Sequence, residues 1–431
     1  MLTIIVFIAV LAVLVLTHEV GHFIAARRCG MAVEEFGFGF PPRIFGVQIW
    51  RKNKLEKISE REEIKVEITE RPMADGSEVI EEKITDEKKE IDIVVPERRW
   101  RFVFGNRDLT PEDGSYGTIY SLNWFPLGGF VRVKGENGES FEPDSFMAQG
   151  VWKKAIFIVA GVLMNIVLGA ALIAAGYMVG LPTLTDKISD ASVIKDRKLE
   201  IMQILPGKPA ETAGLKTGDV ITQIGTLKNP RLTEMQNYVN AHRAEEIAVA
   251  VQRGAETLTK NIKPIVYEET GRGGIGVGLG EFGTVKYPWY KALWQGLLDA
   301  FYYLKEIFVA LYLLVVGLFA GKGAGEAVSG PIGIAIMTGE VARLGFIYLL
   351  QFTAVLSLNL AVVNILPIPA LDGGRLLFLV LNRFKKINFA KYEQAAHSIG
   401  FVLLMLLIVV VTIKDIGTFK GVFISFWDKI F

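Results

Sequence analysis

The chain has 431 residues, of which 51% are hydrophobic, and its mean hydropathy of +0.36 is high for a soluble protein of this length. Because the formal net charge is only +1, the composition does not predict a nucleic-acid-binding surface. The single cysteine, Cys29, excludes an internal disulfide framework, and we expect it to be structural. Long apolar segments alternate with strongly charged ones, which is typical of an integral membrane protein with domains outside the bilayer.

The first apolar segment, residues 1–27, predicts a retained membrane helix. Unlike a secretion signal, it has no basic residue ahead of the apolar run and no small-residue cleavage site after it. Arg27 and Arg28 follow the run and place its C-terminal end in the cytoplasm. The segment contains His18-Glu19-Val20-Gly21-His22, whose histidines are four apart and therefore share one helix face that can bind a metal ion. Glu19 can take a proton from water at that metal.

Residues 28–152 predict a β-rich region on the cytoplasmic side. They contain a charged insertion, 51–119, and a hairpin, 120–135. The insertion alternates charged and apolar residues, as in Glu63-Ile64-Lys65-Val66-Glu67-Ile68, which indicates solvated strands. We therefore expect the insertion to be a solvated structural hairpin.

Further apolar segments predict about four membrane helices in all, with both chain termini outside. Lys153-Lys154 and Arg383-Phe384-Lys385-Lys386 belong in the cytoplasm with Arg27-Arg28, which requires an odd number of crossings between Leu181, at the end of the second helix, and Asn382. Residues 291–320 are therefore expected to lie at the interface or to dip into it. The predicted boundaries are 153–181, 345–382 and 397–431 for the later helices and tail, 383–396 for a cytoplasmic loop and 283–344 for the amphipathic segment.

A catalytic zinc ordinarily has three protein ligands, so the two histidines need a further partner. The candidate is Asp372, in the sequence Asn364-Ile-Leu-Pro-Ile-Pro-Ala-Leu-Asp372-Gly-Gly near the cytoplasmic end of the third helix. His18 and His22 lie near the cytoplasmic end of the first helix. The predicted topology thus brings all three side chains to a similar depth.

The segment before Asp372 cannot be a regular helix, because it contains Pro367 and Pro369. Such backbone is tolerated at membrane depth where it lines a polar cavity. His397 is the alternative third ligand. His242 is excluded because it belongs to the domain predicted outside the membrane.

That outside domain comprises residues 182–282. Its sequence predicts a short helix from Pro209 that stops at Gly214, followed by a Gly218-Asp219 turn into an apolar strand. This pattern resembles a PDZ domain, and only one such unit is visible.

The HExxH motif, the NxxPxPxLDG motif and the PDZ-like insert between them resemble the site-2 protease family of intramembrane zinc metalloproteases. The similarity is greatest to the bacterial branch typified by the regulator of sigma-E protease, and it covers most of the chain. The resemblance implies a polytopic α-helical membrane protein in which Zn²⁺ is held by His18, His22 and Asp372. It also implies that Glu19 is the general base and that Asn364 lies near the scissile bond.

Residues 120–133 resemble the membrane-associated β-hairpin that lies beside the active site in this family. Alternating apolar residues around Gly128-Gly129 agree with a hairpin turn. Strand addition to an exposed edge would hold a substrate extended through main-chain hydrogen bonds. The predicted substrate-binding residues of this segment are Gly128, Gly129, Phe130 and Val131.

Other segments match the family only in part. Gly161 and Asn165 keep a family pattern but lack its usual proline, and we expect helix packing for Gly161 and leave the role of Asn165 open. The segment Ser329–Gly333 also matches, without a chemical role that the sequence explains. The single PDZ-like unit and the long insertion 51–119 depart from the sigma-E regulator, which has two PDZ domains in tandem.

These features predict an intramembrane protease that cuts the transmembrane segments of single-pass membrane proteins, such as anti-sigma factors or remnant signal peptides. It would lie in the bacterial cytoplasmic membrane, with the active site near the cytoplasmic face and the PDZ-like domain outside. The lipid bilayer is its expected surrounding, and no nucleic-acid partner is expected. A membrane-anchored PDZ scaffold with a non-catalytic metal site is the alternative, but a closed structural site needs a fourth ligand. A transporter is disfavoured because no two-fold sequence repeat is visible.

Overall fold

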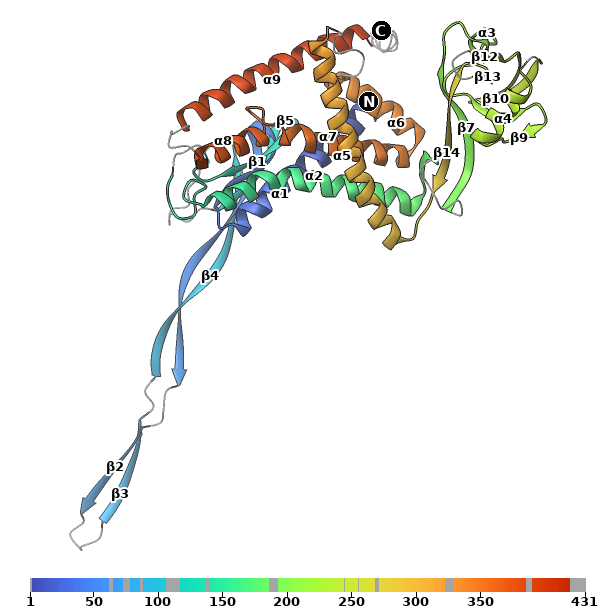
Figure 1. The fold of residues 1–431 in the computed structure, drawn as a ribbon. Helices are drawn as coiled ribbons and strands as arrows, with labels where there is room; N and C mark the ends of the chain where they lie inside the picture. Colours follow the sequence, from blue (N-terminus) through green and yellow to red (C-terminus); the bar gives the residue numbers. More distant parts are fainter. Residues whose placement is uncertain are drawn as a thin grey trace, which may run out of the picture. The chain divides into compact units, whose positions relative to one another are not determined.

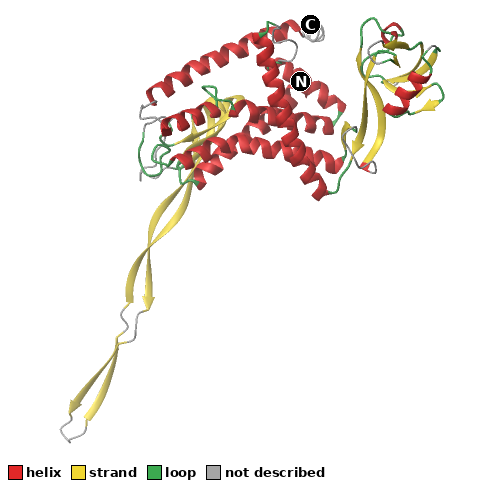
Figure 2. Cartoon of the chain, viewed as in Figure 1, coloured by secondary structure: helices red, strands yellow, loops and turns green. Residues whose placement is uncertain are grey.

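The computed structural model describes residues 2–61, 65–72, 78–85, 88–105, 117–136, 140–185, 193–243, 245–254, 256–267, 271–321, 329–384 and 390–418. The chain divides into two compact units. One comprises Met1–Val10, Val162–Phe378 and Asn388–Phe431, and the other comprises Leu11–Gly161 and Leu379–Ile387. Figure 2 shows long helices and two groups of strands.

Five helices of the described residues are long and apolar enough to cross a membrane, which confirms the predicted polytopic helical class. They are α1 (Leu2–Arg28), α2 (Val151–Val179), α5 (Trp289–Phe319), α7 (Phe346–Ile365) and α9 (Ala390–Thr418) (Figure 1). The helix beyond the expected four is α5, which the sequence placed at the interface because its uninterrupted apolar run is short. The helix instead includes the polar residues on either side of this run and has 31 residues in all. Its length is therefore about 46 Å. That length exceeds the ~30 Å hydrocarbon core of a bilayer.

The sheet of the unit that contains residues 11–161 is built from β1 (Val33–Arg61), β4 (Lys88–Phe104) and β5 (Thr118–Val133), in the order β4-β1-β5. Residues 35–38 of β1 pair with residues 119–122 of β5 and also with residues 129–132. The chain turns at Gly128, whose φ is 143°. The predicted turn is therefore present, but its two arms both pair with β1, because residues 35–38 of β1 lie between them.

Strand β1 bends between residues 38 and 43, where its pairing with β5 shifts. Buried polar side chains hold this bend. Asn123 Nδ2 donates a hydrogen bond to the Gly39 carbonyl oxygen over 3.0 Å. Arg43 forms two hydrogen bonds with the Glu35 carboxylate, of 3.0 and 2.7 Å. The bends of β1 and β5 expose three large aromatic side chains, Phe40, Trp124 and Phe125. Exposed aromatic side chains of this kind suit contact with a membrane.

Beyond its bend, β1 pairs antiparallel with β4 as far as Arg61 and Lys88. A second pair, β2 (Lys65–Pro72) and β3 (Glu78–Thr85), follows within the insertion. The strands predicted for the charged insertion are thus present where the structure describes it (Figure 1). The predicted pattern at residues 63 and 64 and the stretches 73–77, 86–87 and 106–116 lie outside the described residues.

In the other unit, α2 and α5 pack closely because small side chains line their contact. Ala292, Gly296 and Ala300 recur every fourth residue on α5 and are buried. A Cβ at Gly296 would lie 2.8 Å from the Ala170 carbonyl oxygen of α2. On the neighbouring helix α7, Ser357 Oγ donates a hydrogen bond to the Asn165 carbonyl oxygen over 2.8 Å.

An inserted α+β domain follows α2. Its elements are β6 (Leu181–Leu184), β7 (Ile194–Ile204), α3 (Pro209–Thr212), β8 (Val220–Ile224), β9 (Leu227–Lys228), α4 (Leu232–Ala241), β10 (Ile247–Arg253), β11 (Glu256–Ile262), β12 (Ile265–Tyr267), β13 (Arg272–Gly274) and β14 (Val277–Val285). The main sheet has the order β11-β10-β8-β7-β14-β6. Ile201, Ile224 and Val249 are fully buried in its core. The helix expected at Pro209 and the turn expected at Gly218-Asp219 are both present.

The segment Ser329–Gly333, to which the sequence assigned no role, leads into α6 (Pro331–Leu344). The backbone N–H groups of Gly330 and Gly333 donate to the carboxylate oxygens of Asp415 in α9, over 3.1 and 2.7 Å. Asp415 is buried. A carboxylate in this position stabilises a helix N-terminus. These two hydrogen bonds therefore join the start of α6 to α9.

Candidate metal centre

His18 and His22 lie one turn apart on α1 and are both buried, with 8% and 6% of their surface exposed. Their Nε2 atoms are 3.2 Å apart. Two nitrogen ligands of one tetrahedral zinc, each about 2.0–2.1 Å from the ion, lie roughly 3.3 Å apart. The spacing of the two nitrogens therefore fits a shared metal ion.

The orientation of His22 is fixed from α2. Its Nδ1 lies 2.8 Å from the carbonyl oxygen of Phe157, which can only accept a hydrogen bond. Nδ1 therefore carries the proton, and the Nε2 lone pair remains available to a metal. A backbone carbonyl on the second ring nitrogen is typical of metal-binding histidines.

Gly161 of α2 lies directly against the two imidazoles. A Cβ at this position would come well under 3.0 Å from His22 Nε2 and would lie 2.8 Å from His18 Nε2. Only glycine leaves both nitrogens accessible. Helix packing was the expected role of Gly161, and its position beside the metal-facing atoms is one that the sequence analysis missed. The sequence signals were a glycine within an apolar helix and its partial match to a family pattern.

Asp372 begins α8 (Asp372–Phe384), after a break that starts where α7 ends at Ile365. The break contains the predicted prolines and Ala370, whose φ of 80° is rare for a residue with a side chain. A Cβ at Gly373 would come well under 3.0 Å from the carbonyl oxygens of Ile365 and Leu366. The glycine that follows Asp372 is thus required by the tight turn into α8.

His18, His22 and Asp372 form a group that can hold a metal ion, since one ligand atom of each lies within 4.8 Å of the others. Two imidazole nitrogens and a carboxylate oxygen are a donor set that suits zinc. Together with the space that Gly161 leaves, the residues present fit the ion that the sequence predicts.

The two other histidines have different contacts. His397, the alternative third ligand, accepts a hydrogen bond at Nδ1 from the Ala370 backbone N–H over 2.9 Å and is not in the metal-binding group. His242 lies in the inserted domain, where its ring stacks on Tyr238. Asp372 is therefore the third ligand that the geometry favours.

The predicted base and one predicted substrate-binding residue lie side by side. A Cβ at Gly129 would lie 3.2 Å from Glu19 Cγ, so β5 passes directly beside the base. Phe130 and Val131 pair with Gly37 and Phe36 of β1. Among the described residues, 129–133 pair with β1 alone, which leaves the other edge of this segment open to a further strand.

Two asparagines lie on long apolar helices, Asn364, which is a predicted site residue, and Asn165, whose role the sequence left open. Asn364 is in the last turn of α7, immediately before the break that leads to Asp372. Asn165 is fully buried on α2, and its backbone oxygen accepts the hydrogen bond from Ser357. The structure thus places Asn364 next to the loop that carries Asp372.

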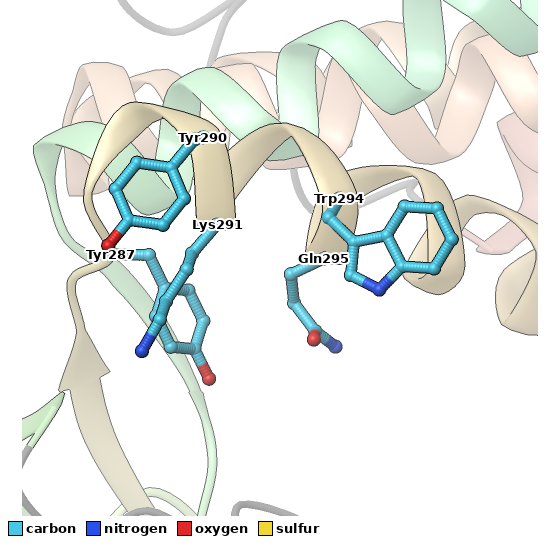
Figure 3. Close-up of a pocket in the computed structure, with 5 residues that line it drawn as sticks. All are labelled: Tyr287, Tyr290, Lys291, Trp294 and Gln295. Carbon is cyan, nitrogen blue, oxygen red and sulfur yellow. The ribbon is translucent and has the colours of Figure 1, made fainter.

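A hollow of about 380 Å³ at the start of α5 contains none of the predicted site residues. It is lined by Tyr287, Tyr290, Lys291, Trp294 and Gln295. Figure 3 shows the polar ends of Lys291, Tyr287 and Gln295 on the same side of the helix. Gln295 donates to Asp299, which also accepts from Tyr177. These contacts anchor α5 on α2.

Comparison with known proteins gives matches over nearly the whole chain. The profile of Peptidase family M50 matches residues 6–56 and 100–407, which include both metal motifs. Zinc metalloprotease RasP of Geobacillus kaustophilus is 31% identical over 97% of this chain and 98% of the relative. Regulator of sigma-W protease RasP of Bacillus subtilis is 31% identical over 96% of this chain and 98% of the relative.

Among solved structures, the PDZ domain of an SdrC-like protein from Listeria monocytogenes matches the chain with a TM-score of 0.18 and 23% sequence identity. The match covers 19% of this chain and 85% of the Listeria domain.

Proposed function

The chain belongs to peptidase family M50 and is a multi-pass membrane zinc metalloprotease of the site-2 type, and on this premise we propose which residues act and what they cut. His18, His22 and Asp372 hold the zinc, and Glu19 is the general base. The observation that carries the assignment is the convergence of three ligand atoms within 4.8 Å. The 3.2 Å separation of the histidine nitrogens supports it.

Zinc bound by these residues supplies Lewis-acid chemistry, which polarises a substrate carbonyl and acidifies water. The Glu19 carboxylate takes the water proton and passes it to the leaving amine. His22 keeps its orientation throughout, because its Nδ1–H is held by the Phe157 carbonyl. Gly161 keeps the space in front of both imidazoles open.

The substrate binds as an added strand. A transmembrane helix protects its peptide bonds within its own hydrogen-bonded ladder, so the substrate must unwind before it can be cut. The open edge of residues 129–133 offers main-chain partners to the unwound segment, and Gly129 places that edge beside Glu19. The proposed binding edge also includes Phe130 and Val131, and Gly128 at its start. Asn364, which precedes the Asp372 loop, contacts the substrate near the scissile bond.

The substrates are single-pass membrane proteins, such as anti-sigma factors or remnant signal peptides. One relative carries the name of a regulator of sigma-W protease, which supports the anti-sigma class. The enzyme lies in the bacterial cytoplasmic membrane. Its metal site is near the cytoplasmic face, where Arg27 and Arg28 end α1, and the inserted domain is outside.

The direct test compares wild type with Glu19→Gln on a model single-pass substrate in detergent, with zinc measured in both proteins. Cleavage by the variant should fall about 10²–10⁴-fold, while zinc content stays at the wild-type level. Glu306→Gln, an exposed position on α5, is the matched control and should cleave normally. Undiminished cleavage by Glu19→Gln would disprove the assignment of the base, and a folded wild type without zinc would disprove the metal site.

A further inference from the structure

His397 of α9 contacts the loop that carries Asp372, not the metal-binding group itself. Its Nδ1 accepts the hydrogen bond of the Ala370 backbone N–H over 2.9 Å. Because Nδ1 accepts, the neutral ring carries its proton on Nε2. Nε2 is buried and has no hydrogen-bond partner among the described residues. Among the described residues, the bond to Ala370 is therefore the one that holds this imidazole.

The bond is made at the most strained residue of the loop. Ala370, two residues before Asp372, is the described non-glycine residue with the largest positive φ, 80°. A backbone in this region persists only when its surroundings hold it there. The prolines remove two donors from the loop, and the N–H groups of Ile368 and Leu371 bond to carbonyl oxygens within it. The Ala370 N–H is bonded instead to a group outside the loop, His397. A bond from outside the loop therefore has a large influence on its conformation.

A second contact from α9 lies one turn further along the helix. A Cβ at Gly400 would lie 2.5 Å from the Pro369 carbonyl oxygen, so the helix surface touches the loop there. His397 and Gly400 are three residues apart and share one face of α9. The ring of His397 also packs on Phe378 of α8, with the ring centroids 5.6 Å apart. The imidazole thus contacts both the loop and the helix that Asp372 begins.

We propose that His397 is a positioning residue, whose Nδ1 holds the Ala370 peptide in its left-handed conformation and thereby sets the place of the Asp372 carboxylate at the metal. The inference rests on the proposed function, since it assigns the role of Asp372 as third ligand. It makes α9 a part of the metal centre's support, although this helix contributes no ligand.

The chain allows a matched pair of substitutions. His397→Asn keeps an acceptor, because the asparagine Oδ1 takes the place of the imidazole Nδ1. His397→Leu has the same branched shape and no acceptor. We expect His397→Leu to weaken zinc binding about 10–100-fold, the usual effect of removing a residue that orients a ligand. His397→Asn should bind zinc as the wild type does.

The readout that separates positioning from mere packing is the visible absorption of the full-length protein loaded with Co²⁺, which reports the geometry of the ligands. His397→Leu should shift this spectrum, and His397→Asn should restore it. The cleavage rate kcat should fall with the spectral change while KM stays near its wild-type value. Equal spectra for all three proteins would overturn the proposal, and so would equal shifts in both variants.

Gly400→Ala tests the same idea without touching His397. Its Cβ would push on Pro369 and should shift the Co²⁺ spectrum as His397→Leu does. Gly417→Ala on the same helix has open space around it and should not. An unchanged spectrum of Gly400→Ala would count against the proposal. A wild type that binds neither Zn²⁺ nor Co²⁺ would refute the proposed function together with this inference, whereas metal binding that no α9 variant alters would refute the inference alone.

Discussion

The proposed ligands of the metal centre are placed by two different kinds of structure. His18 and His22 lie on α1, where a spacing of four residues is enough to align them. Asp372 follows a break in which Ala370 has a φ of 80°. The next residue, Gly373, has no room for a side chain. The first arrangement comes from local helix geometry. The second is held by groups that lie far along the chain, including His397.

This difference indicates which parts of the metal centre are sensitive to mutation. A helix keeps its side-chain directions as long as it forms, so the histidine pair can be disturbed chiefly by filling the space in front of it. The loop has no such periodicity, and any residue that fixes its backbone affects Asp372. Carboxylates elsewhere in the molecule are also placed by distant partners, as Asp219 is by Arg253 and Asp415 is by Gly330 and Gly333.

The largest effect is expected for Gly161→Ala. Alanine favours a helix over glycine by about 1 kcal/mol, so a loss cannot come from the helix itself. The added Cβ collides with the Nε2 atoms of the histidines, and zinc content and cleavage should both fall at least 100-fold, roughly the upper end of the effect of groups that orient ligands. Gly317→Ala, which has open space around it on α5, is the control. A Gly161→Ala variant that is fully loaded with zinc and active would show that the space in front of the two imidazoles can be filled without loss.

On the loop side, Gly373→Ala should weaken zinc binding about 10–100-fold. Its Cβ would meet backbone carbonyl oxygens, which cannot move aside as a flexible side chain would. Zinc affinity is measured by competition with a chelator, and circular dichroism checks that the helices remain. If affinity does not change, Asp372 does not depend on the tight turn, and the contrast between helix and loop fails.

A smaller effect, confined to the inserted domain, is expected for Asp219→Asn. The pKa of Asp219 lies below its usual value of 3.8, chiefly because Arg253 donates hydrogen bonds to the carboxylate, although burial alone would raise it. A depressed folded-state pKa adds stability that is present above the unfolded-state pKa and is lost as pH falls through the folded-state value. Amide hydrogen exchange in β8 and β10 should therefore speed up below about pH 4 in wild type.

In Asp219→Asn the same amides should exchange about 10-fold faster at pH 7, and acid should accelerate them less than in wild type. Cleavage of a membrane substrate that lacks a large outer domain should not change. Wild-type and variant domains with the same acid response would show that the Asp219–Arg253 pair does not stabilise the domain.

The smallest effect is expected for Asp415→Asn. The asparagine amide can accept from only one of the two glycine N–H groups, and its own N–H₂ opposes the other. Loss of such a cap costs about 0.5–2 kcal/mol. Exchange of the first amides of α6 should accelerate, while zinc content stays constant. A change in zinc content would mean that the α6–α9 connection also supports the metal centre.

Much of the fold and of the candidate site could be predicted from the sequence. The apolar segments located four of the helices that are long enough to cross a membrane, and the turn chemistry at Pro209 and Gly218-Asp219 located α3 and the start of β8. Helix α5 was expected at the interface, because polar residues interrupt its apolar run. Contacts with small residues of α2 support the start of α5, and no hydropathy pattern records such contacts.

The sequence by itself determined that His18 and His22 share one helix face, because helix periodicity acts over a few residues. It also predicted Glu19 as the base and Asp372 as the third ligand. Only the tertiary structure decided that Gly161 faces the two imidazoles, that both arms of β5 pair with β1 and that His397 supports the Ala370 backbone. These relations join groups as far apart as His22 and Phe157, which are separated by 135 residues. Such contacts follow from how the helices and strands pack, and packing leaves no periodic mark in the sequence.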